Sequence, residues 1–158
     1  NGNNYSPSSP LEAIKLGVHM SPKDRASNAV IKDFDIERNL TIPFLKSYSW
    51  LSLLKFNSLK NVTKGTINDL GIVCQTETDD IETLSGGNQQ KVVVGRWLLK
   101  SCSLLVLDEP FVGLDQTTAD QINSFLAQKI SQGVGLVLTS HITPMIDCAA
   151  LDLGANNA

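Results

Sequence analysis

The chain has 158 residues, of which 42% are hydrophobic and 18% are charged, and its formal net charge is −3. The length and composition predict one ordinary globular domain. The chain lacks the positive charge that favours nucleic acid, and it contains no apolar run of the ~20 residues needed to span a bilayer. Three scattered cysteines without a C-x-x-C pair argue against a disulfide framework and indicate a reducing, cytoplasmic setting.

The N-terminal part of the sequence predicts a loop, a helix and a strand. Residues 1–10 are rich in Asn, Ser, Pro and Gly, as loops are. A short helical pattern follows over Leu11–Leu16 and ends at Gly17. Val18–Ser21 then has the composition of a short strand.

Residues 31–83 predict a helical insert. Apolar side chains recur there at three- and four-residue spacing among polar ones, as in Ile36 and Leu40. Pro43 and Gly65 interrupt this pattern, so we expect two or three short helices instead of one long helix.

After residue 83 the pattern changes to that of an α/β protein. A glycine-rich loop, a helix, an apolar strand, a turn, a second helix and a second apolar strand follow in order, as in a parallel sheet. Leu104–Leu107 and Leu136–Thr139 are continuous apolar runs, which predicts strands covered on both faces. Gln116–Ile130 predicts the crossover helix between them. The expected division is an α/β core of residues 1–30 and 84–158 with a helical subdomain of residues 31–83.

Two adjacent carboxylates follow the first apolar run. Asp108 and Glu109 stand at the carboxyl end of the strand, and ligands of open α/β sheets bind outside that end. One carboxylate there can face a Mg²⁺ ion while the next orients an attacking water. The alternative interpretation is a surface turn formed with Pro110.

A glycine-rich segment precedes the helix expected at Lys91–Lys100. Gly86 and Gly87 allow the backbone to approach an anion closely, and Ser85 offers a hydroxyl group. The unpaired N–H groups of the new helix point to the same place, which favours a phosphate site. The alternative is a plain glycine-containing helix start.

Together, these segments resemble the signature motif and the Walker B strand of ABC ATPases. Leu84–Gln90 reads LSGGNQQ, and its ending, with Lys91, resembles the form found in ATPases of ribose-, galactose- and xylose-type sugar importers. Leu16–Arg25 and Ser9–Ile14 resemble a segment of the second nucleotide-binding half of those proteins. The resemblance extends to about residue 147.

The resemblance implies a partial P-loop NTPase of the ABC type, which uses ATP and Mg²⁺ in a head-to-tail dimer of nucleotide-binding domains. Asp108 would hold Mg²⁺, Glu109 would polarise the attacking water, and His141 would be the switch histidine that contacts the γ-phosphate. The segment 113–115 resembles the D-loop, which links the two ATP sites. The implied nucleotide-binding residues, which include signature residues facing the ATP of the opposite domain, are Ser85, Gly86, Gly87, Gln89 and Asp115.

The sequence departs from the family pattern at several points. It contains no G-x-x-x-x-G-K-[ST] segment, so we expect a chain truncated before the Walker A loop and inactive alone. We also expect its sheet to have unpaired edges or an exposed apolar face. Lys23 stands where the family has Gln and the sugar-importer halves have Glu, which puts the link to the membrane subunit in doubt. Phe111 replaces the usual Thr after the Walker B proline.

The leading hypothesis is an ATPase subunit that couples ATP hydrolysis to carbohydrate import. Its expected partners are membrane subunits and a second nucleotide-binding domain, at the cytoplasmic face of the membrane, without nucleic acid. One alternative is a non-hydrolysing regulatory or dimerisation module that contributes only its signature loop, which Lys23 favours and Glu109 disfavours. Another is an ABC ATPase outside transport.

Overall fold

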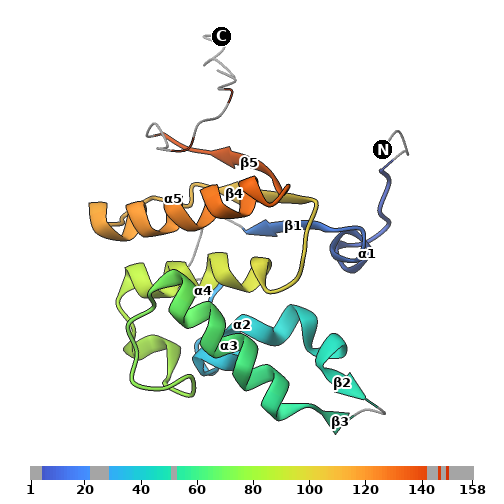
Figure 1. Cartoon of the computed structure of the whole chain (residues 1–158), viewed down its shortest axis with the longest axis vertical. Coiled ribbons are helices and arrows are strands. Elements are labelled where there is room, and N and C mark those ends of the chain that lie inside the picture. The colour runs from blue at the N-terminus through green and yellow to red at the C-terminus, as the bar shows by residue number, and fades with distance from the viewer. Residues whose placement is uncertain (1–4, 22–28, 51–52, 142–145, 147–148, 150–158) are drawn as a thin grey trace.

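The computed structural model describes residues 5–21, 29–50, 53–141, 146 and 149. Its main sheet is parallel and has the strand order β1-β4-β5 (Figure 1), with the bounds β1 Val18–Ser21, β4 Leu104–Asp108 and β5 Gly135–Thr139. In register, Ser21 lies opposite Leu107, and Asp108 lies opposite Thr139. The carboxyl ends of the strands therefore meet at one edge, and the expected parallel α/β class is confirmed.

Helix α5 (Gln116–Ser131) is the predicted crossover between β4 and β5. Asp115 begins it as N-cap, because its carboxylate accepts a hydrogen bond from the backbone N–H of Thr118 at 2.9 Å. Ile122 and Leu126 of α5 pack against Leu105 and Leu107 of β4, and all four side chains are at most 1% exposed. Burying each of them contributes about 1.5–3 kcal/mol, so this contact fixes the helix to the sheet.

Among the described residues, no element covers the opposite face of the sheet at β5, and the prediction of strands covered on both faces is wrong for this strand. Every residue of β5 is exposed or half-buried, whereas β4 alternates between half-buried and buried. Met20, Val106 and Val137 lie side by side in register, and Met20 and Val137 are 55% and 53% exposed. The expected exposed apolar face is therefore present, because α5 covers the other side of the strands.

Short helices make up most of the segment 31–83, as expected. Its elements are α2 (Ile36–Thr41), the 3₁₀ helices η2 (Ile42–Tyr48) and η3 (Ile81–Thr83), and α3 (Phe56–Leu70). Pro43 stands in the first turn of η2, where its missing N–H is not needed. The sequence also predicted helix α1 (Pro10–Lys15) to within one residue, with Gly17 following at a φ of 81°.

Two details of this segment differ from the expectation. Gly65 does not interrupt a helix but lies inside the 15-residue α3, at an exposed position where an added Cβ would have no neighbouring atom within 4 Å. A glycine costs a helix only about 1 kcal/mol, which the buried face of α3 outweighs. The short antiparallel hairpin of β2 (Ser49–Trp50) and β3 (Leu53–Leu54) was not expected.

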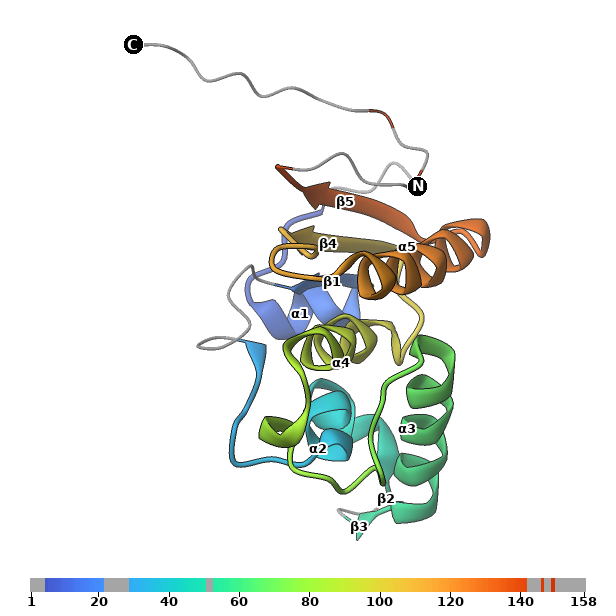
Figure 2. The same ribbon diagram turned by 90° about the vertical axis from the view of Figure 1, so that its left-hand side faces the viewer.

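Helix α4 (Gly86–Leu98) lies between the sheet and helices α2 and α3 (Figure 2). Val92 and Val93 pack in one core cluster with Ile36 and Leu40 of α2. Val94, one residue further, belongs instead to the cluster of β4 and α5. All three valines are fully buried, so α4 joins these two hydrophobic clusters.

Candidate functional site

The predicted carboxylates stand at the edge where the parallel strands end. Asp108 is the last residue of β4 and is half-buried, whereas the Glu109 residue is only 7% exposed. Glu109 has a φ of 48°, the left-handed region that residues other than glycine avoid. Such a backbone persists only where the surroundings hold it, and strained residues of this kind cluster at functional sites.

The structure brings Glu109 and His141 together. The Nε2 atom of His141 lies 3.0 Å from Oε1 of Glu109, and the backbone N–H of His141 donates to Oε2 at 3.3 Å. The imidazole is 83% exposed while the carboxylate is 6% exposed. The pair therefore places an accessible ring over a nearly buried carboxylate at the end of the sheet.

Thr139 is a residue of this site that the sequence analysis missed. Its hydroxyl donates to Oδ1 of Asp108 at 2.5 Å and accepts from the backbone N–H of Glu109 at 3.0 Å. The carbonyl of Thr139 also accepts from the N–H of Glu109, at 3.2 Å. Its position could have identified it from the sequence, because Thr139 ends a strand parallel to the one that carries Asp108, and ligands bind at such strand ends.

The composition of the acidic edge fits a Mg²⁺ ion shared with a nucleotide. Among the described residues, no group of three or more His, Cys, Asp and Glu side chains could hold a metal alone. Asp108 contributes one carboxylate, whose Oδ1 atom accepts a hydrogen bond from Thr139. Mg²⁺ is usually bound through one or two carboxylates together with substrate phosphates and water, so Asp108 is a suitable protein ligand.

The signature residues lie at the N-terminus of α4. Ser85 is its N-cap and accepts hydrogen bonds from the N–H and the side-chain amide of Asn88, at 3.4 and 3.1 Å. Ser85 and Gly86 are exposed, as a phosphate site requires. Gln89 instead directs its amide nitrogen to the carbonyls of Ile81 and Leu84, both at 3.2 Å, so that nitrogen holds the preceding turn.

Gly87 has a packing role that the sequence did not reveal. A Cβ atom there would lie 3.0 Å from Oγ1 and 3.1 Å from Cγ2 of Thr118 in α5. The hydroxyl of Thr118 in turn donates to Asp115 at 2.8 Å. The signature segment therefore contacts the first turn of the helix that follows the predicted D-loop.

Asp115 is held as an ionised helix cap. Its hydrogen bonds from the backbone N–H and the hydroxyl of Thr118 lower the pKa of the carboxyl below its usual value. The nearby Lys91 contributes in the same direction. Lys91 is 3% exposed, donates to the carbonyl of Gly71 at 2.7 Å, and has its own pKa lowered by burial. A buried cation thus connects α4, the end of α3 and the predicted D-loop.

A direct hydrogen bond joins the two motifs. Gln90 of α4 is buried and donates from Nε2 to the carbonyl of Pro110 at 3.0 Å. Pro110 follows Glu109 directly, so the signature helix is bonded to the turn that contains the acidic pair. Such buried amide contacts are directional and fix the relative position of two elements.

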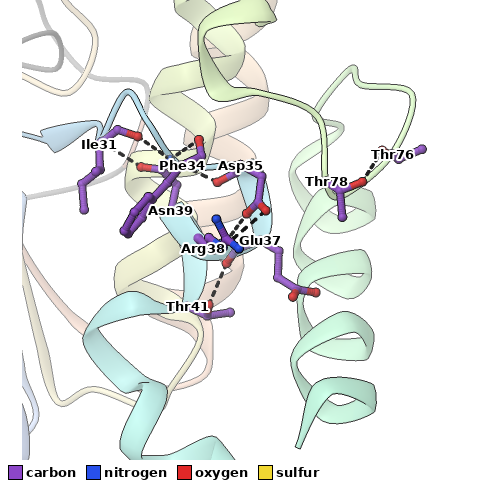
Figure 3. Close-up of polar contacts among 9 residues, drawn as sticks. All are labelled: Ile31, Phe34, Asp35, Glu37, Arg38, Asn39, Thr41, Thr76 and Thr78. Atoms are coloured by element: carbon purple, nitrogen blue, oxygen red, sulfur yellow. Dashed lines mark hydrogen bonds and ion pairs between the residues drawn. The ribbon is translucent and has the colours of Figure 1, made fainter. Parts of the chain in front are cut away.

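The other end of α4 is anchored by Arg96. This residue is 6% exposed and donates to the carbonyl of Asn39 at 2.5 Å, to Oδ1 of Asn39 at 2.9 Å and to the carbonyl of Ala29 at 2.5 Å. Burial lowers the pKa of its guanidinium to about 10. Figure 3 shows how Asn39 also bonds to Ile31 and Phe34, which fixes the loop before α2.

Two further features lie apart from the acidic edge. A groove of about 520 Å³ between the end of α3 and α5 is lined by residues such as Gly71 and Gln121, and none of the predicted site residues lines it. Lys23, which the sequence analysis singled out for its charge, lies outside the described residues. Within the described part of the chain, no helix has both the length and the apolar character needed to cross a membrane.

Known proteins are similar to this chain over most of its length. The ribose import ATP-binding protein RbsA of Bacillus cereus is 32% identical over 146 residues, which are 92% of this chain and 29% of that protein. The galactose/methyl galactoside import ATP-binding protein MglA of Pasteurella multocida is 35% identical over 135 residues, 85% of this chain and 27% of that protein. The chain therefore spans less than a third of the length of these relatives.

A protein of known structure has a similar fold, and the sequence itself matches a known family. A dimeric ATP-binding cassette in a post-hydrolysis state, bound to ADP and Pi, superposes with a TM-score of 0.67 at 17% identity, covering 79% of this chain and 52% of that one. At that identity the likeness shows the fold alone. The family described as ABC transporter matches residues 16–112, which include the signature helix and the acidic pair. The chain therefore belongs to the ABC transporter family.

Proposed function

We propose that this chain is part of the ATP-hydrolysing subunit of an ABC importer for carbohydrates. The contact of Glu109 with His141, at 3.0 Å and at the carboxyl ends of parallel strands, carries the proposal. Family membership and the names of the sugar-import relatives support the substrate class. The partners are membrane subunits and a second nucleotide-binding domain, and the chain acts as a peripheral component at the cytoplasmic face of the membrane.

In this proposal Glu109 is the base that orients and deprotonates the attacking water. Its carboxylate is nearly buried and is held by the backbone N–H of His141, which limits its rotation. The exposed imidazole of His141 is free to contact a phosphate that approaches from outside the chain. Phosphoryl transfer depends mainly on such positioning and on charge neutralisation.

The remaining predicted residues bind the nucleotide and the metal. Ser85 and Gly86, exposed at the start of α4, meet the γ-phosphate of an ATP held by the second domain, since a helix N-terminus attracts anions. Gly87 permits the close packing of this segment on Thr118. Asp108 is the protein ligand of Mg²⁺, which neutralises phosphate charge when it is bound.

We also propose that the 158-residue chain alone does not hydrolyse ATP. Its sequence has no G-x-x-x-x-G-K-[ST] segment to surround the β- and γ-phosphates. Phosphate release by the isolated chain should therefore equal that of a buffer blank. Hydrolysis that is lost in the Glu109→Gln variant of the same chain would contradict this part of the proposal.

The decisive test is Glu109→Gln in the full-length gene product that contains this chain. Loss of a general base lowers kcat by about 10²- to 10⁴-fold, while labelled ATP should still bind, because the amide preserves size and shape. Glu82→Gln is the matched control, since Glu82 is exposed and its ion pair with Lys32 is as long as 4.0 Å.

Three outcomes separate the hypotheses. Loss of turnover with retained ATP binding supports the hydrolytic function. Unchanged turnover in Glu109→Gln removes the assignment of the base. Absence of ATP binding by the complete wild-type protein would favour a module that contributes only its signature loop.

A further inference from the structure

Thr139 is the point at which the two carboxylate residues of the site are tied to the neighbouring strand. It ends β5 in register with Asp108, the last residue of β4. A backbone N–H can only donate, so the hydroxyl must accept from the N–H of Glu109 at 3.0 Å. Its single proton is then available for Oδ1 of Asp108, 2.5 Å away. One hydroxyl group thus contacts both residues at once.

These two bonds restrict the freedom of both residues. The N–H of Glu109 is shared between the hydroxyl and the carbonyl of Thr139, which fixes the peptide group that leads into the left-handed φ of 48°. The bond to Oδ1 fixes the rotation of the Asp108 carboxylate. A hydrogen bond to an ionised acceptor is shorter and stronger than a neutral one, so this orientation is well defined.

We propose that Thr139 is a positioning residue of the hydrolytic site. It orients the Asp108 carboxylate toward the metal and holds the backbone from which the Glu109 side chain extends. The inference rests on the proposed function, because it takes Asp108 and Glu109 to be the metal ligand and the base.

The exposed location of Thr139 indicates that its hydroxyl contributes little to the stability of the fold. The residue is exposed at the end of an edge strand, and Val137, on the same face of β5, is 53% exposed. Water can solvate the polar groups that lose an exposed partner, which limits the cost in stability, but it does not hold them in one orientation. Loss of the hydroxyl should therefore change metal binding and turnover without unfolding the chain.

The test compares Thr139→Val with Thr139→Ser in the full-length gene product. Valine keeps the size and the β-branch of threonine but lacks the hydroxyl, whereas serine keeps the hydroxyl. We expect kcat to fall about 10- to 100-fold in the valine variant, as for loss of a hydrogen bond to a charged group, and to remain within about threefold of wild type in the serine variant. The Tm should change little.

A metal titration gives a readout that needs no turnover. Mn²⁺ serves as the probe in place of Mg²⁺, and the free ion is followed by electron paramagnetic resonance in the presence of a non-hydrolysable ATP analogue. The Mn²⁺ concentration at half-saturation should rise about 10-fold or more in Thr139→Val and stay near wild type in Thr139→Ser.

The outcomes distinguish this proposal from the function on which it rests. Wild-type kcat and Mn²⁺ affinity in Thr139→Val, with an inactive Glu109→Gln variant, would overturn the positioning role and leave the function intact. Equal losses in the valine and serine variants would overturn it as well, because the hydroxyl would then not be responsible. If Glu109→Gln stays active, the proposed base is wrong, and the Mn²⁺ titration alone decides whether Thr139 orients Asp108.

Discussion

Two polar clusters flank helix α4, and they differ in their exposure to water. Around Arg96 the guanidinium is 6% exposed and bonds to Asn39 and Ala29. At the end of the sheet, His141 is 83% exposed over the carboxylate of Glu109. Water can reach the imidazole of the second cluster but not the guanidinium of the first. We therefore expect the buried cluster to determine stability and the exposed cluster to determine activity.

The largest effect on stability should come from Arg96→Met. This change removes the Arg96 donor from the carbonyls of Asn39 and Ala29 and one of the two donors to Oδ1 of Asn39, so the free energy of unfolding should fall by about 2–4 kcal/mol. Urea unfolding measures the loss. Arg38→Met is the control, because Arg38 is 65% exposed and pairs with Asp35 at 3.6 Å, and it should cost less than about 1 kcal/mol. Equal losses in the two variants would refute the contrast between buried and exposed clusters.

An intermediate effect should come from Gly95→Ala in the buried part of α4. A methyl group there would lie 2.7 Å from Leu70 and 2.8 Å from Thr66, so overpacking should lower the free energy of unfolding by about 1–2 kcal/mol. Gly65→Ala is the same change at an exposed position of α3 with open space around it, and it should stabilise by about 0.5–1 kcal/mol. Thermal melts of both variants should shift in opposite directions, and a common direction would contradict the packing argument.

The smallest effect should be the pH dependence contributed by Asp115. Because its hydrogen bonds from Thr118 lower the pKa in the folded state, the ionised group stabilises the fold above its ordinary pKa of about 3.9. That contribution is lost as the pH falls through the lower folded value. Asn caps a helix without titrating, so the Tm difference between wild type and Asp115→Asn should shrink from pH 6 to pH 2.5. Asp69→Asn, at an exposed position, serves as the control; a difference that grows toward low pH would contradict the direction of the shift.

The sequence predicted the strands of the main sheet and the crossover helix because these depend on local pattern. The apolar run Leu104–Leu107 forms β4, and Asp115 begins α5 as a capping residue. The same reasoning failed for β5, since an apolar run does not indicate which neighbours cover it. It also failed at Gly65, where the packed face of α3 outweighs the low helix propensity of glycine.

The functional residues divide in the same way. Asp108, Glu109 and His141 were named from motifs, and the structure brings Glu109 and His141 into contact, while their catalytic roles stay predictions. Thr139 carries no motif and was missed. Its bond to Asp108 joins residues 31 positions apart, and no local pattern encodes that distance.

The sequence by itself therefore determined the types and order of the elements of the α/β core and the strand end at which the carboxylates lie, because periodicity, caps and glycine-rich turns act over a few residues. The tertiary structure decided which face of the sheet is covered, the attachment of Arg96 to Asn39 across 57 residues, and the hydroxyl group shared by Asp108 and Glu109. These features arise when segments distant along the chain pack together, so they depend on the whole fold and not on the residues nearby.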